Sequence, residues 1–216
     1  SYHPAHLLHQ LSGGEFKGYW NRQVMIFDVK RALMQSRFSE LILPQRTIEI
    51  CKNSAQLAEF RARYKGKKIR MGTDIEANGT CIPVCVGLSF TPNHAIVVPL
   101  WNVDGISTIP DSDLIQCWII LAEMLWENEI VGANFNYDRD KLKRLGFAIR
   151  KLVSDIMLKA HSINPELPKG LAFNTSIFTE ESFYKDEGMY HGKIEDLLLG
   201  CGRDACVTIE VDEAMD

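Results

Sequence analysis

Three apolar stretches follow one another between residues 68 and 100, and they constrain the fold more than any other part of the chain. They are residues 68–75, 82–90 and 95–100, and the segments between them contain Asn78-Gly79 and Thr91-Pro92-Asn93, which are typical turn sequences. Strand-length segments joined by short turns predict an antiparallel meander. We therefore expect a β-sheet at the centre of the molecule.

Other segments predict that helices flank this sheet. The alternating run 47–51 and the short apolar run 130–134 predict two further strands, which makes a five-stranded sheet. A long helix is expected after Pro110, with acidic residues in its first turn, and another from about Ile194 to the C-terminus. From Asp138 onward the sequence predicts mainly helices. These elements together predict an α/β domain with a mixed sheet.

Residues 1–44 predict a helical N-terminal extension that is distinct from residues 45–216. Gly13-Gly14 interrupts the pattern, and apolar residues then recur every three to five positions from Trp20 to Leu33. Pro44 closes the segment. We expect this extension to pack on the α/β domain.

Composition limits the classes of function. The chain has 216 residues and a net charge of −4, so its overall charge repels nucleic acids. Either a nucleic acid is not the ligand, or metal ions and a local basic stretch overcome this repulsion. Two basic stretches occur, at residues 65–70 and 139–151. No apolar run approaches the length of a membrane span, so no membrane association is expected. Six cysteines without zinc-binding spacing predict reduced, buried thiols and a cytoplasmic protein.

Four acidic residues predict a metal centre. Asp74 and Glu76 lie two residues apart on a predicted strand, so both side chains point to the same face, where a divalent cation is the simplest neutralising group. The alternative is a solvent-exposed strand with ordinary acids. Asp138 begins a helix after a buried strand, and Asp204 lies on an apolar helix where a carboxylate needs a partner. Four carboxylates suit two Mg²⁺ or Mn²⁺ ions that activate water.

The order of these acids resembles the three exonuclease motifs of family A DNA polymerases. The motifs are Asp-Ile-Glu at 74–76, Gly-x-Asn-x-x-Tyr-Asp at 132–138, and Asp-Ala-x-Val-Thr at 204–208. The segments between them are similar to phage members of the family, and the resemblance covers about residues 45–216. Such domains belong to the DnaQ-like (DEDD) group, whose fold is ribonuclease H-like.

This resemblance implies a function and a role for each residue. It implies a proofreading 3′→5′ exonuclease that acts on the 3′ end of single-stranded DNA, releases nucleoside 5′-monophosphates and is followed by a C-terminal polymerase domain. A phage origin would place it in the cytoplasm of a bacterial host. Asp74, Glu76, Asp138 and Asp204 would be the catalytic, metal-binding acids. The substrate-binding residues would be Ala77 and Asn78, against the 3′-terminal nucleotide, and Asn134, which would orient the site.

One position departs from the family pattern. A tyrosine that holds the attacking water is expected four residues before Asp204, where this chain has Gly200, and the histidine of a sister group would fall at Leu199. Tyr190 or His191 would be possible substitutes, or metal ions alone would activate the water more slowly. We favour retained metal binding with weakened hydrolysis. A catalytically silent DNA-binding or structural domain, and an exonuclease that trims RNA, remain the alternatives.

About the first 35 residues resemble the C-terminal end of a family 4-type uracil-DNA glycosylase. The similarity comprises the segment 1–8, in which His3 would match the histidine of the loop that reaches a flipped uracil, and the apolar stretch from Trp20 to Leu33. The resemblance includes no water-activating site, so we expect no glycosylase activity from this chain.

Overall fold

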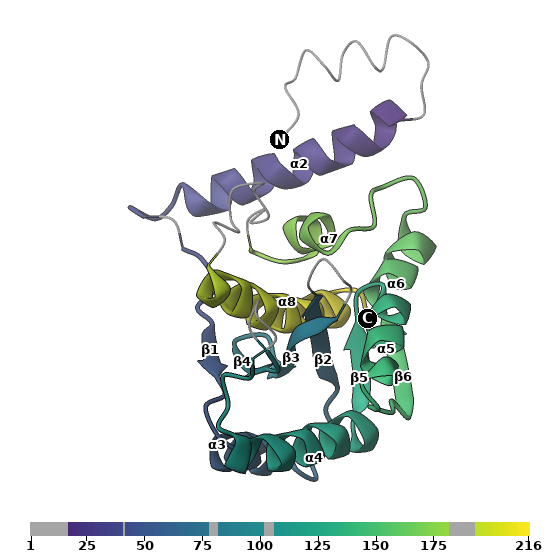
Figure 1. Cartoon of the computed structure of the whole chain (residues 1–216). Coiled ribbons are helices and arrows are strands. Elements are labelled where there is room, and N and C mark those ends of the chain that lie inside the picture. Colours follow the sequence, from purple (N-terminus) through teal and green to yellow (C-terminus); the bar gives the residue numbers. More distant parts are fainter. Residues whose placement is uncertain (1–16, 41, 78–81, 102–105, 182–192) are drawn as a thin grey trace.

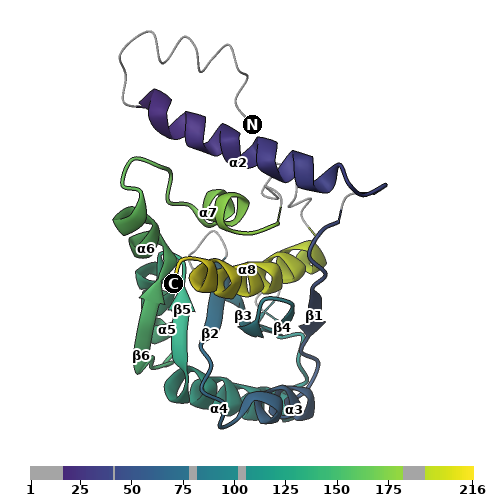
Figure 2. The same cartoon turned by 180° about the vertical axis from the view of Figure 1, so that it is seen from behind.

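A six-stranded mixed sheet lies at the centre of the computed structural model, which describes residues 17–40, 42–77, 82–101, 106–181 and 193–216 (Figures 1 and 2). The strands are β1 (Thr47–Ile50), β2 (Met71–Ala77), β3 (Pro83–Thr91), β4 (His94–Pro99), β5 (Glu129–Gly132) and β6 (Lys151–Asp155). The helices are α2 (Lys17–Gln35), α3 (Ser54–Tyr64), α4 (Asp111–Glu127), α5 (Phe135–Arg144), α6 (Ile156–Ile163), α7 (Leu171–Phe178) and α8 (Ile194–Ala214).

The strand order is β1-β4-β3-β2-β5-β6. The strands β2, β3 and β4 pair antiparallel, which confirms the predicted meander. The strand β1 is parallel to β4 at one edge, and β5 and β6 continue parallel to β2 at the other. The fold is therefore α/β with a mixed sheet flanked by helices, as the sequence predicts.

The alternation of side chains along β2 divides them between the two faces of the sheet. Met71 and Ile75 belong to the main hydrophobic core, which also contains Leu57 of α3 and Leu121 of α4. The opposite face is covered by α8, which contacts all strands from β1 to β5 (Figure 1). Gly72, Asp74 and Glu76 alternate with the core residues and so point toward α8.

Glycines allow α8 to lie unusually close to the sheet. A Cβ atom at Gly72 would collide with the backbone carbonyl of Ala205, and one at Gly87 would lie 2.7 Å from the carbonyl oxygen of Cys201. On the helix side, a Cβ at Gly202 would collide with the side chain of Ile48. Side chains at these positions would force the helix away from the sheet, because a packed interior has no spare volume.

The predicted count of five strands is wrong, because the sheet has six. The additional strand is β6, whose residues belong to a region that the sequence predicts to be mainly helical. This strand is short, lies at the sheet edge and carries Lys151 and Ser154 beside only two apolar residues, Leu152 and Val153. Edge strands bury little surface, so they lack the apolar pattern by which a strand is identified in a sequence.

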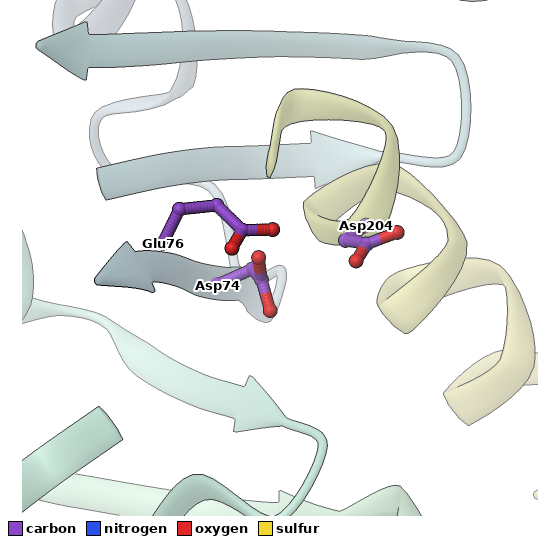
Figure 3. A group of neighbouring side chains, drawn as sticks. All are labelled: Asp74, Glu76 and Asp204. Carbon is purple, nitrogen blue, oxygen red and sulfur yellow. The ribbon is translucent and has the colours of Figure 1, made fainter. Parts of the chain in front are cut away.

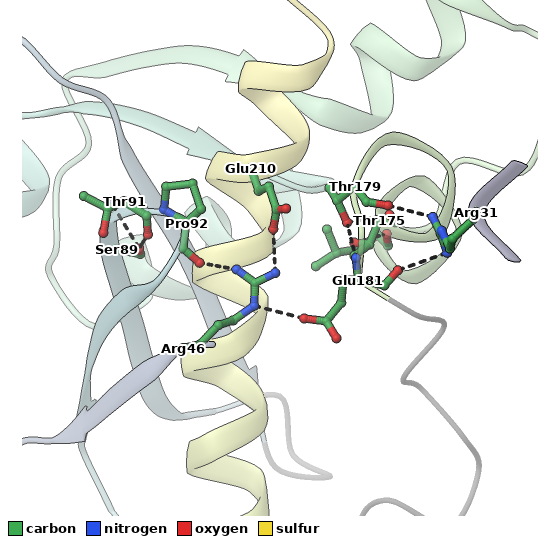
Figure 4. A network of polar contacts seen from close by, with 10 residues as sticks. Arg31, Arg46, Ser89, Thr91, Pro92, Thr175, Thr179, Glu181 and Glu210 are labelled. Atoms are coloured by element: carbon green, nitrogen blue, oxygen red, sulfur yellow. Dashed lines mark hydrogen bonds and ion pairs between the residues drawn. The ribbon is translucent and has the colours of Figure 1, made fainter. Parts of the chain in front are cut away.

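The helix predicted within residues 1–44 is present as α2, and Arg31 binds it to α7 (Figure 4). The guanidinium of Arg31 donates hydrogen bonds to the carbonyl oxygens of Ser176, Thr179 (2.6 Å) and Glu181 (3.4 Å), beside the C-terminal end of α7. A cation suits this end of a helix, where carbonyl groups lack partners. Residues 1–16, which include His3, lie outside the described residues.

A second arginine joins three separate segments. Arg46, which precedes β1, pairs with Glu210 of α8 (2.5 Å) and with Glu181 after α7 (3.0 Å), and it also donates to the carbonyl oxygen of Pro92 (Figure 4). The side chains of Arg46 and Glu181 are only 5% and 4% exposed. This buried network fixes α8 relative to the edge of the sheet.

In the described part of the chain, no helix combines the length and the apolar character that crossing a membrane requires. Five cysteines of that part are buried and not in disulfides, as predicted, and Cys81 lies outside it.

Candidate metal centre

Three of the four predicted acids meet between β2 and α8. Asp74 and Glu76 extend from β2 toward Asp204, which α8 supplies (Figure 3). One carboxylate oxygen from each residue lies within 4.8 Å of those from the other two, and Asp204 is 1% exposed. Oxygen ligands of a magnesium ion at roughly 2.1 Å lie at most roughly 4.2 Å apart, so small side-chain rotations suffice to coordinate one ion.

The close packing of α8 explains why these acids meet. Gly72 precedes Asp74 by two residues on the same face, and it is the position at which the backbone of Ala205 touches the strand. In addition, the Cys201 thiol donates a hydrogen bond to the backbone carbonyl of Asp74 (3.5 Å). The helix α8 therefore contacts β2 at Ala205, one residue after Asp204, and at Cys201, three residues before it.

The fourth acid, Asp138, lies in the first turn of α5 and outside the group of three. It is 6% exposed, and its pKa is raised to about 8, mainly by burial and then by the negative charges of Glu76 and Asp155. Glu76 thus links Asp138 electrostatically to the group of three. A site that keeps several carboxylates close together, with Asp138 and Asp204 buried, suits a divalent cation, which lowers the cost of ionising them.

The other predicted residues are only partly within the described structure. Ala77 ends β2 directly after Glu76, and Asn134 precedes α5 in the left-handed conformation (φ 57°, ψ 40°). Gly200 is buried on α8. It lies one helical turn before Asp204, so a side chain there would share a face with Asp204. Asn78, Tyr190 and His191 lie outside the described residues.

Asp155 has a structural position that sequence reasoning missed. Its carboxylate accepts hydrogen bonds from the backbone amides of Asn134 (3.1 Å), Phe135 (2.9 Å) and Met157 (2.9 Å). An acid directly before the apolar run Ile156–Leu158 is the usual sequence signal of a helix N-cap. That signal would have revealed the bond to Met157, but not the two bonds to the start of α5.

The raised pKa of Asp138 predicts how pH and metal ions affect stability. The folded protein holds this proton more tightly than the unfolded chain, so the free energy of unfolding falls as pH rises from about 4 toward about 8. Asp138→Asn should remove this contribution. Urea unfolding in EDTA at pH 5 and pH 8 measures it: the loss between the two values should be larger for the wild type than for the variant. Added Mg²⁺ should reduce that difference, and equal losses without metal would contradict the assignment.

Comparisons with known proteins establish the fold. No family model matches the chain, and no curated protein sequence matches it either. Among solved structures, it is similar to the POL domain of Pol1 from M. smegmatis in complex with DNA primer-template and dNTP (12% identity, TM-score 0.61, 79% of this chain). The match takes up 27% of the M. smegmatis chain.

Two further similar structures match over most of both chains. One is described as the apo form of the nuclease (16% identity, TM-score 0.55, 81% of this chain and 80% of that chain). The other is Brucella melitensis NrnC with bound Mg²⁺ (13% identity, TM-score 0.52, 81% of this chain and 80% of that chain). At these identities the likeness concerns the fold. It agrees with the expected ribonuclease H-like arrangement, with six strands in place of the predicted five.

Proposed function

We propose that this chain is a divalent-metal-dependent 3′→5′ exonuclease that hydrolyses the 3′-terminal phosphodiester of single-stranded DNA. The observation that carries the proposal is the approach of Asp74, Glu76 and Asp204 to within 4.8 Å from two elements far apart in the sequence. The three similar structures support it, because one is described as a nuclease, one is NrnC with bound Mg²⁺, and one is a POL domain in complex with DNA primer-template and dNTP.

Each acid would have a distinct part in the reaction. Asp74, Glu76 and Asp204 would hold the metal through hard carboxylate oxygens, and Asp138 would complete a four-acid site for a pair of ions. Two bound Mg²⁺ or Mn²⁺ ions would lower the pKa of a coordinated water and neutralise charge on the scissile phosphate. Ala77 and Asn134 flank these acids, at the end of β2 and the start of α5, where they would orient the terminal nucleotide.

The outer face of α5 supports a nucleic acid as the substrate. Arg139 directly follows Asp138, and together with Lys143 and Asn136 it lines a hollow of about 530 Å³. Asp140 lines the same hollow, and its charge is paired with Arg144. In the described part of the chain neither Arg139 nor Lys143 forms an ion pair. Cations on the helix that carries Asp138 would attract the phosphates of a strand whose 3′ end lies among the four acids.

Gly200 is the basis for proposing a slow rather than a fast enzyme. A tyrosine at this position would share a face with Asp204, where it would help to hold the attacking water. We predict that Gly200→Tyr raises kcat by about 10²-fold, the low end of the roughly 10²–10⁴-fold that positioning help of this kind is typically worth. Single-turnover hydrolysis of labelled single-stranded DNA measures it. Equal rates in a variant that folds as stably as the wild type would show that Gly200 does not limit the reaction.

The biological setting we propose is the proofreading module of a phage-like DNA polymerase in a bacterial cytoplasm. Gly200 also favours a second candidate, a silent domain that binds DNA without cleaving it. A test uses single-stranded DNA and RNA labelled at the 5′ end, with Mg²⁺, with Mn²⁺ or with EDTA. The proposal expects a metal-dependent ladder of DNA products shortened from the 3′ end. Binding of metal and DNA without cleavage would favour the silent domain, and faster cleavage of RNA would favour an RNA-trimming enzyme.

A further inference from the structure

The turn between β5 and α5 is an unusual piece of backbone beside the candidate metal centre. Asn134 is the one described residue other than glycine with a positive φ. Left-handed backbone is unfavourable for residues with a side chain and persists where neighbouring groups hold it. The ring of Phe135 fills the space that a Cβ at Gly132 would occupy, and Phe135 is fully buried. This packing fixes one side of the turn.

Asp155 holds the other side of the turn. It lies at the end of β6 directly opposite Gly132 in the parallel pairing of β5 with β6. One of its carboxylate oxygens accepts from the Asn134 and Met157 amides and the other from the Phe135 amide. These amides begin two helices, where backbone donors lack partners within the helix. The side chain of Asn134 makes no capping hydrogen bond of its own.

We infer that Asp155 is a positioning residue, which holds the β5–α5 turn in the conformation that presents Asp138 to Glu76. Asp138 lies three residues after Phe135, in the first turn of a helix whose start is held by this carboxylate. Charged hydrogen bonds to amides are among the stronger ones, so their loss would loosen the helix start. The two carboxylates are close enough that the charge of Asp155 raises the pKa of Asp138.

The proposed role of Asp155 goes beyond that of an N-cap of α6. A plain cap would need only the bond to Met157, and its loss would loosen α6 alone. Both oxygens of Asp155 are already used by amides, so it serves as a positioning residue rather than as a fifth metal ligand. Its effect on hydrolysis would come through Asp138, and this part rests on the proposed function.

Hydrogen–deuterium exchange of the metal-free protein tests the structural half. In Asp155→Asn, one acceptor oxygen is replaced by an amide group that cannot accept, and Asp155→Ala removes both. Exchange of the Asn134 and Phe135 amides should accelerate by roughly 10- to 100-fold in Asp155→Ala and less in Asp155→Asn. Amides in the middle of α8 should be unchanged. Acceleration confined to α6, or none, would overturn the inference.

Kinetics at a temperature well below the unfolding midpoint of each variant tests the functional half. Asp155→Asn should lower kcat by about 10-fold or more with little change in KM, because single-strand contacts remain. Asp111→Asn, which changes an exposed first-turn acid of α4, serves as the matched control and should keep wild-type kcat. An unchanged kcat in Asp155→Asn would also overturn the inference. A wild-type protein without any hydrolysis would instead contradict the proposed function, since the exchange measurement does not depend on it.

Discussion

Replacing Asp204 by asparagine is expected to lower the rate of 3′-end hydrolysis by roughly 10³-fold or more. Asp204 is 1% exposed and supplies the only carboxylate that α8 contributes to the group of three. Metal ions contribute several kcal/mol to such reactions, and about 1.4 kcal/mol corresponds to tenfold in rate. The size of asparagine is nearly that of aspartate, so the packing of α8 on Gly72 and Gly87 should survive.

Two further measurements make this result specific. Calorimetric titration with Mn²⁺ should show an affinity at least about 10-fold weaker for Asp204→Asn, because even the loss of an outer-shell partner costs that much. Glu195→Gln removes one charge from an exposed position in the first turn of the same helix and should leave both rate and affinity unchanged. Wild-type hydrolysis by Asp204→Asn would exclude the carboxylate from the reaction.

Replacing Arg46 by methionine is expected to lower the free energy of unfolding by about 3–5 kcal/mol. Methionine preserves much of the apolar stem but leaves the carboxylate of Glu181, which is 4% exposed, buried without its cation. Removing one partner of a buried ion pair typically costs that much, whereas removing both costs far less. Arg46→Met combined with Glu181→Gln should therefore recover part of the loss.

Urea unfolding monitored by circular dichroism measures these differences. Arg63→Met serves as a control, because Arg63 pairs with Glu49 and Glu59 on the surface and such pairs add little measurable stability. If Arg46→Met unfolded at the same urea concentration as Arg63→Met, the network of Figure 4 would not stabilise α8.

Those parts of the fold that rest on local pattern could be predicted from the sequence. The apolar stretches of β2, β3 and β4 with the turn residues between them, the acidic first turn of α4 and the long α8 all have local signals in the sequence, and the structure confirms these elements. The strand β6 could not be predicted, because an edge position demands few apolar residues. The hydrogen bonds of Arg31 and the ion pairs of Arg46 could not be predicted either, since they join residues more than a hundred positions apart.

Some residues of the candidate site could be predicted from the sequence, and others could not. Asp74 and Glu76 share a face because a strand has a period of two, and this follows from the sequence alone. The approach of Asp204 to these two acids depends on how α8 crosses the sheet. Gly72 and Gly202 allow the close packing of α8, but their presence in the sequence does not predict it. The two bonds of Asp155 to the start of α5 depend on the pairing of β5 with β6, and β6 itself was missed.

The most direct test of the central claim is a crystal structure of the protein soaked in Mn²⁺, with anomalous scattering recorded near the manganese edge. We expect an anomalous peak among the carboxylates of Asp74, Glu76 and Asp204, with oxygen distances typical of manganese, and a second peak toward Asp138. Well-ordered carboxylates with no peak among them, at a Mn²⁺ concentration that supports cleavage of single-stranded DNA, would contradict the account.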